Sequence, residues 1–205
     1  MIRLATTGLL VAAGLAFVAG SARAEIATPA VGTTVEYRCS GTYEDHYVWN
    51  IVEDQGDRLR VEGTADGKPV WAEKEPYTLG LTLALRRDRG DGEGVRTQSY
   101  DADDLRDYLA LKPGTKVTAD VRERRSGAKF EWAYEISVGE FRPIDHPVAG
   151  SLEVVKIVEK RWIYRSKYSA TMTFDLAPAE GIPISIVYKD PKGTQTCDLS
   201  AWTTG

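Results

Sequence analysis

Histidine is scarce in this chain of 205 residues, which has two of them, His46 and His146. Each follows an aspartate, but they lie a hundred residues apart and form no HExxH or similar helical pattern. We therefore expect no metal, no cofactor and no catalytic residue. A metal-dependent or acid–base hydrolase that uses His46 or His146 stays as an alternative, because imidazole is the usual acid–base and metal-binding side chain.

Several catalytic and nucleotide-binding motifs are also missing. The chain has no G-x-S-x-G nucleophile elbow, no phosphate-cradling glycine loop and no dinucleotide fingerprint. It lacks a basic excess as well, since its formal net charge is −4, so we expect no nucleic-acid partner. We interpret the local basic groups, Arg86–Arg87 and Arg122–Arg125, as solvated strand ends and turns.

Long hydrophobic runs are absent beyond the first 24 residues. There, Arg3 precedes an apolar stretch from Leu9 to Val18, and Ala22–Ala24 gives the small-x-small pattern of a signal peptidase site. The apolar core is shorter than the roughly 20 residues of a membrane-spanning helix. We predict a signal peptide over residues 1–24, a single β-rich domain over 25–205, a periplasmic or secreted location and no transmembrane segment after cleavage.

Only two cysteines are present, Cys39 and Cys197, near the two ends of the predicted mature chain. An oxidising compartment favours pairing of an even number of cysteines, so we predict a disulfide between them. Closing a loop of this length stabilises a fold by roughly 5 kcal/mol in the chain-entropy model, as an upper figure. The bond requires the first and last strands to be neighbours.

Alternation of apolar and polar residues dominates the rest of the chain. The run Phe130, Trp132, Tyr134, Ile136 and Val138 places five apolar side chains on one face of a strand. Asp66-Gly67 indicates a tight hairpin turn. The pattern predicts an all-β fold: an antiparallel curved sheet, barrel or half-barrel of about ten to twelve strands, with one short helix at about 103–111 that an aspartate caps.

Two segments depart from the alternation. Thr78–Leu85 is almost wholly apolar, which fits either a strand buried on both faces or a short buried helix. Arg86–Gly94 is charged and rich in glycine, but its acids do not have the spacing of an EF-hand loop. We interpret it as a mobile surface loop.

Aromatic residues are the most informative feature that the chain does contain, including five tryptophans. Two interpretations remain open: they fill the core, or they line a cavity inside a curved sheet that suits an apolar or lipid-like small molecule. For the second, the candidate ligand-binding residues are Trp49, Trp132, Tyr134 and Trp162.

The second half of the chain resembles a family of uncharacterised, exported, β-rich bacterial envelope proteins. The resemblance covers about residues 105–190 and is carried by three turn segments that precede strands: Leu111–Gly114, His146–Leu152 and Leu176–Ile184. It implies a β-rich envelope protein and supplies no catalytic residues. The pair Cys39 and Cys197 departs from the family pattern.

Together these features favour a non-enzymatic, exported protein with a binding or envelope-associated role. A lipid or lipoprotein carrier or chaperone with an apolar groove is the first alternative, and the hydrolase is the second. The sequence leaves the ligand and the oligomeric state open.

Overall fold

A computed structural model of the chain describes residues 26–42 and 45–205. The predicted signal peptide, residues 1–24, lies outside the described residues. Within the described ranges, no helix is long and apolar enough to cross a membrane.

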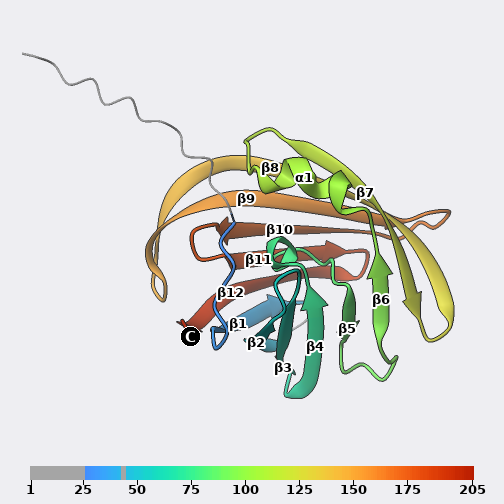
Figure 1. Cartoon of the computed structure of the whole chain (residues 1–205), viewed down its shortest axis with the longest axis horizontal. Coiled ribbons are helices and arrows are strands. Elements are labelled where there is room, and N and C mark those ends of the chain that lie inside the picture. Colours follow the sequence, from blue (N-terminus) through green and yellow to red (C-terminus); the bar gives the residue numbers. More distant parts are fainter. Residues whose placement is uncertain (1–25, 43–44) are drawn as a thin grey trace, which may run out of the picture.

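The described residues form a closed antiparallel barrel of twelve strands (Figure 1). This confirms the predicted all-β fold and decides between its alternatives, because the sheet closes fully and is not a half-barrel. The strands are β1 (Thr34–Gly41), β2 (His46–Asp54), β3 (Leu59–Ala65), β4 (Lys68–Lys74), β5 (Arg86–Asp88), β6 (Arg96–Ser99), β7 (Lys116–Arg125), β8 (Ala128–His146), β9 (Gly150–Ile163), β10 (Ser169–Ala177), β11 (Ile182–Asp190) and β12 (Gly193–Thr203).

The barrel has a simple up-and-down order, in which each strand pairs with its neighbours along the chain. Tight turns allow consecutive strands to pair, as in the β3–β4 hairpin. There Asp66 and Gly67 have φ of 50° and 73°, the left-handed values that the predicted Asp-Gly turn requires.

The ring closes where the first strand meets the last. β1 pairs with β12 in a register that sets Cys39 directly opposite Cys197, and the two cysteines form a disulfide. The predicted bond and the predicted adjacency of the first and last strands are both confirmed.

The one α-helix among the described residues is shorter than the sequence predicts. A 3₁₀-helix, η2 (Ala102–Leu105), leads into α1 (Arg106–Leu109), and the side chain of Asp101 accepts a hydrogen bond from the Asp103 N–H (3.0 Å). Leu105, Tyr108 and Leu111 are buried in a cluster with residues of β7 and β8. The helical segment is therefore held by packing along the barrel wall.

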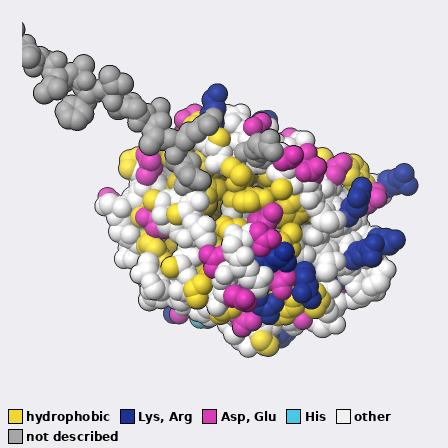
Figure 2. Space-filling view, in the orientation of Figure 1, with side chains coloured by type: hydrophobic (Ala, Val, Ile, Leu, Met, Phe, Trp, Pro, Cys, Tyr) yellow, Lys and Arg dark blue, Asp and Glu magenta, His cyan; other side chains and the backbone are white. Residues whose placement is uncertain are grey.

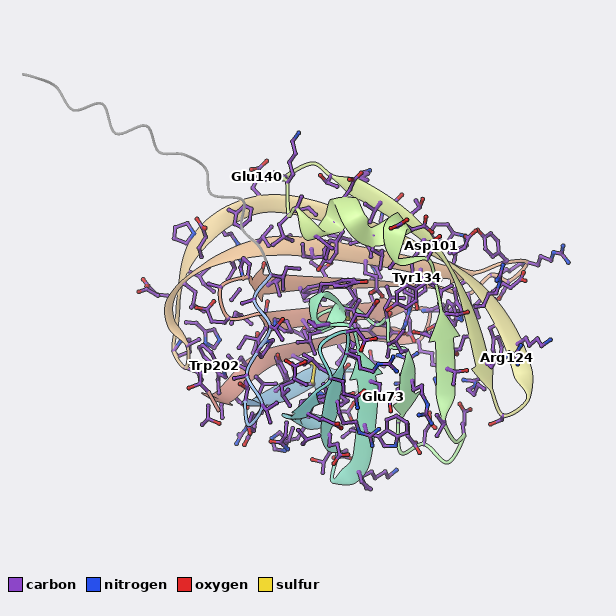
Figure 3. The ribbon with its side chains drawn as sticks, in the orientation of Figure 1. Glu73, Asp101, Arg124, Tyr134, Glu140 and Trp202 are labelled. Atoms are coloured by element: carbon purple, nitrogen blue, oxygen red, sulfur yellow. A yellow bond between two sulfur atoms is a disulfide. The ribbon has the colours of Figure 1, made fainter. Side chains whose placement is uncertain are left out.

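Alternation determines which side chains face the lumen. In β7, Val117, Ala119 and Val121 are buried and the residues between them are exposed. Figure 3 shows the outcome: Tyr134 lies in the interior, while Arg124 lies near the tip of β7. Figure 2 shows several Lys and Arg side chains on the right-hand side of this face and others at its lower centre.

The apolar run after β4 is neither of the two predicted elements. Residues 75–85, named here the internal segment, contain only a short 3₁₀-helix, η1 (Pro76–Thr78), and irregular chain. The segment lies inside the ring of strands (Figure 1), where Thr78, Leu81, Leu83 and Ala84 are almost fully buried. An added Cβ at Gly80 would contact Phe174 of β10, which shows how closely the segment packs on the barrel wall.

The charged loop that follows is partly regular. Arg86–Asp88 form β5, which pairs with β4 and β6, so this part of the predicted surface loop is a strand. The interpretation of Arg87 as a solvated residue is also wrong, because its side chain is only 16% exposed and contacts the buried Glu123. As the middle residue of β5, it points to the lumen by the same two-residue period that buries apolar side chains.

Candidate functional site

The barrel holds a partly open cavity of about 820 Å³ beside the internal segment. This volume falls in the range of small-molecule sites, roughly 300–1,000 Å³. Its lining comes from all twelve strands, from the internal segment and from the extended chain before β1, which includes Pro29 and Thr33. The cavity is therefore the lumen of the barrel, and we treat it as the candidate site.

The extended chain before β1 passes across the barrel between two distant strands. Its Ala27 N–H donates to the carbonyl of Pro178, which follows β10, and its Gly32 N–H donates to the carbonyl of Ile51 in β2 (both 2.8 Å). In Figure 1 this chain runs in front of the sheet. It therefore covers part of the lumen.

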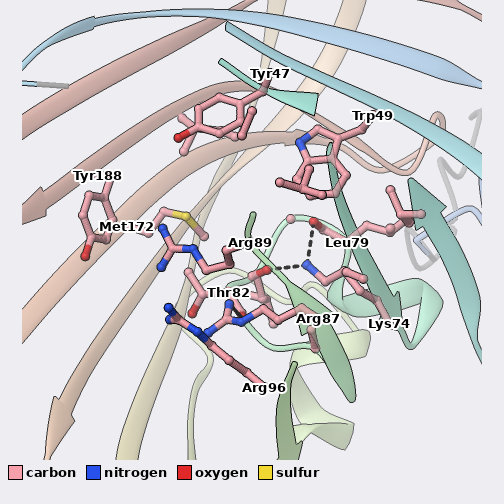
Figure 4. Close-up of a pocket in the computed structure, with 18 of the residues that line it drawn as sticks. Tyr47, Trp49, Lys74, Leu79, Thr82, Arg87, Arg89, Arg96, Met172 and Tyr188 are labelled. Carbon is pink, nitrogen blue, oxygen red and sulfur yellow. Dashed lines mark hydrogen bonds between the residues drawn. The ribbon is translucent and has the colours of Figure 1, made fainter. Parts of the chain in front are cut away.

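One side of the cavity is apolar and aromatic. Tyr47 and Trp49 of β2 lie on this side in Figure 4, with Leu79 of the internal segment close to Trp49. Ile51 and Val61 continue the apolar wall along β2 and β3. Figure 2 shows hydrophobic side chains grouped in the centre of one face, next to acidic and basic ones.

The opposite side carries arginines. Arg87, Arg89 and Arg96 come from β5, β6 and the turn between them, and Figure 4 places them across the cavity from Tyr47 and Trp49. Arg161 of β9 also lines the cavity. The lumen is thus amphipathic, with an aromatic wall facing a cationic one.

Acidic side chains, of which Glu123 is buried, hold part of this cationic wall. Arg87 contacts Glu123 (3.3 Å), which also accepts a hydrogen bond from Gln98 Nε2 (2.8 Å). Burial lowers the pKa of Arg87 to about 10, so it stays protonated at neutral pH. Arg96 pairs with Asp91 and with Glu93 (2.6 Å to the latter).

Other buried charges hold the internal segment. Lys74 Nζ donates to the carbonyls of Leu81 (2.6 Å) and Leu79 (3.1 Å). Glu159 accepts hydrogen bonds from the N–H (2.8 Å) and the hydroxyl (2.5 Å) of Thr82. These bonds satisfy backbone groups that an irregular buried chain leaves unpaired.

The basicity of Lys74 reflects this environment. Burial and the nearby Arg87 together lower the pKa of Lys74 to about 7, although the charge of Glu159 acts in the other direction. Lys74 therefore exchanges its proton near neutral pH while its nitrogen stays at the cavity wall.

The structure brings two of the four predicted ligand-binding residues to the cavity. Trp49 and Trp132 line it. Tyr134 is buried on the same inward face of β8 as Trp132, and its hydroxyl contacts Thr82 Oγ1 (3.4 Å), so it belongs to the packed interior. Trp162 lies outside the cavity and is 37% exposed, because its neighbours Arg161 and Ile163 are the residues of β9 that face the lumen.

The two histidines do not meet. His46 lies 3.4 Å from Glu36 on the exposed surface, and His146 Nδ1 accepts hydrogen bonds from the N–H groups of Val148 and Ala149 in its own turn. Among residues 26–42 and 45–205, no three His, Cys, Asp or Glu side chains are grouped as metal ligands. Nothing in this geometry favours the hydrolase alternative.

Sequence reasoning missed the charged residues of the lumen: Lys74, Arg87, Arg89, Arg96, Glu123, Glu159 and Arg161. A signal for some of them was present. Lys74 continues the inward set of Val70 and Ala72, and Glu123 continues that of Val117 to Val121. A charged residue in the buried phase of a strand indicates a polar lumen.

No protein-family model matches the chain, and no curated protein matches it in sequence. Among solved structures, it is similar to the hypothetical lipoprotein YmcC from Escherichia coli K12, with 11% identity, 82% of each chain covered and a TM-score of 0.53. A putative lipoprotein from Parabacteroides distasonis is 9% identical over 85% of this chain and 96% of that chain, with a TM-score of 0.45. At such identity, the likeness to YmcC shows a shared fold.

Proposed function

We propose that this protein is an exported, envelope-associated binding protein that holds an apolar or lipid-like small molecule in the lumen of its barrel. The observation that carries the proposal is the cavity of about 820 Å³ with its continuous apolar wall, since such concave apolar sites are where proteins bind small molecules. The ligand sits inside a closed barrel, which replaces the open groove that the sequence suggested for a carrier.

Export is supported by two features. The first 24 residues have the three regions of a signal peptide. The disulfide between Cys39 and Cys197 is of the kind that persists outside the reducing cytoplasm. The solved structure of similar fold is described as a hypothetical lipoprotein, which agrees with an envelope role.

Tryptophan fluorescence gives a direct test of the lumen. Trp49 and Trp132 line the cavity and Trp162 does not, so a lumenal ligand changes the emission of the first two. We expect single-chain lipids to shift the emission of the native protein. The shift is reduced in Trp49→Phe and Trp132→Phe variants and kept in the matched control Trp162→Phe.

Extraction of the purified protein with organic solvent, followed by mass spectrometry, tests the same proposal without a chosen probe. We expect a co-purified lipid or apolar metabolite in stoichiometric amount. A protein that carries none and shows no fluorescence response across a broad panel of apolar compounds would contradict the proposal.

A further inference from the structure

The arginines of the lumen differ in how well the protein compensates their charge. Arg87 is held by Glu123, Arg96 by Asp91 and Glu93, and Arg125 by Glu93 (2.8 Å). Carboxylates of the chain already balance the charges of these three arginines, although the Nε atoms of Arg87 and Arg96 are buried without a hydrogen-bond partner. We therefore assign these arginines to the structure of the cavity wall.

Arg89 is different. It lies in the turn that follows β5, lines the cavity, and in Figure 4 extends into it beside Met172 and Tyr188. Within residues 26–42 and 45–205, no carboxylate lies at ion-pair distance from Arg89, and its guanidinium makes no hydrogen bond. The positive charge of Arg89 acts on Tyr47 across the lumen and on the neighbouring Arg87. A guanidinium without a protein partner is therefore available to an anion inside the cavity.

Further donors surround the same place. The hydroxyls of Tyr168 and Tyr188 lie 2.9 Å apart, and Arg161 Nη2 donates to the Tyr188 hydroxyl (3.3 Å). Burial and the hydrogen bond to Tyr188 raise the pKa of Tyr168 to about 12, so its hydroxyl keeps its proton at neutral pH. All three residues line the cavity. Arg89 is thus accompanied by a second arginine and by a pair of phenols. The bond between the two hydroxyls uses one O–H, so the other O–H can donate to a ligand.

We propose that the lumen selects amphiphiles with a single anionic head group, a carboxylate or a phosphate, and places that group on Arg89 near Arg161 and Tyr188. The apolar tail then lies against the wall formed by Trp49 and Ile51. Guanidinium forks match the paired oxygens of both head groups. This inference rests on the proposed function, because it assigns the chemistry of the ligand that the lumen holds.

The test compares three probes of equal chain length, dodecanoate, dodecyl phosphate and dodecanol, each titrated below its micelle concentration into the native protein at neutral pH. Tryptophan emission and calorimetry report binding. We expect at least one of the two anionic probes to bind ten times more tightly than dodecanol or better, with a preference that weakens at high salt. The relative affinities of the two anions identify the head group.

Substitution of Arg89 then locates the anion. We expect Arg89→Gln to lower the affinity for the preferred anion to that for dodecanol and to leave dodecanol binding and the thermal unfolding midpoint unchanged, since Arg89 makes no contact that holds the fold. Arg122→Gln, on the exposed face of β7, is the matched control and keeps the native preference.

Three outcomes overturn the inference. If dodecanol binds as tightly as both anions, the lumen binds apolar chains without selecting a head group, and the proposed function survives alone. If an anion is preferred but Arg89→Gln binds it as the native protein does, the anion site lies elsewhere. If none of the three probes binds, the inference and a lipid-like ligand both fall.

Discussion

Lys74 shows how a single buried cation adapts to its surroundings. Its nitrogen donates to two carbonyls of the internal segment, and burial beside Arg87 brings its pKa to about 7. In the unfolded chain an unperturbed lysine has a pKa near 10.4. Between these two values the unfolded state binds more protons than the folded state, so the free energy of unfolding rises with pH.

This gives a prediction for pH-dependent stability. Relative to a Lys74→Met variant, the native protein becomes more stable as the pH rises from 7 to 9.5, by at most about 1.4 kcal/mol per pH unit, and the difference is constant below the folded pKa. Urea unfolding of both proteins across this range measures it. The exposed Lys116→Met is the control and shows no such slope relative to the native protein. A Lys74→Met difference that is flat from pH 7 to 9.5 would contradict the lowered pKa.

At this scale the sequence predicted apolar side chains better than charged ones. Alternation assigned Tyr134 and Trp132 to the inward face correctly, and the same rule applied to β9 places Arg161 inside and Trp162 outside. Hydrophobicity would place Trp162 inside and Arg161 outside, whereas the two-residue alternation along β9 places them the other way round. The prediction followed hydrophobicity, but the structure follows the alternation, because a strand cannot turn one side chain without turning its neighbours.

At the scale of the elements, the internal segment contains little regular secondary structure, and side chains of other strands hydrogen-bond to its backbone. Its N–H and carbonyl groups bond to Glu159, Lys74, Gln98 and Arg87, which lie on four different strands. No sequence pattern of Thr78–Leu85 could reveal these partners, since they are 14 or more residues away in two of the four cases. An apolar run predicts a strand or a helix. In the structure, side chains of other strands make the hydrogen bonds that the backbone of a strand or a helix would have made.

Glu159 is the anchor of this element and allows a prediction. It is fully buried, and its removal leaves the Thr82 N–H without a partner. We expect Glu159→Ala to lower the free energy of unfolding by about 3 kcal/mol, because a buried donor loses a hydrogen bond to a charged group. Glu135→Ala is the matched control: Glu135 pairs with the exposed Lys160 at 3.3 Å, so the loss is below about 1 kcal/mol. Equal losses in the two variants would show that Glu159 does not hold the segment.

At the scale of the whole molecule, the barrel was the most predictable feature. Alternating strands with tight turns gave its class, and the positions of Cys39 and Cys197 gave the contact that closes it. The cavity could not be derived in the same way. Whether inward side chains fill a barrel or leave space depends on their summed volumes and on the path of the internal segment, and neither is a local property of the sequence.

The disulfide should matter for the stability of the whole barrel. It links residues separated by 158 positions, so the Cys39→Ser, Cys197→Ser double variant loses up to about 5 kcal/mol of unfolding free energy in the chain-entropy model. Denaturant unfolding of the native protein, with and without reductant, and of the double variant measures the loss. The reduced native protein and the double variant should agree. Unchanged stability on reduction would show that the β1–β12 ladder holds the ring without the bond.

The order of the strands has a consequence for biogenesis. Within the described barrel, β1–β12 is the one ladder between strands that are not consecutive, so hairpins can assemble as the chain emerges while the ring stays open. The edges of β1 and β11 stay unpaired until β12 (Gly193–Thr203) is added, because β12 pairs with both strands. A chain truncated before Gly193 keeps both edges, which are templates for pairing with other chains, and has no enclosed compartment for a guest.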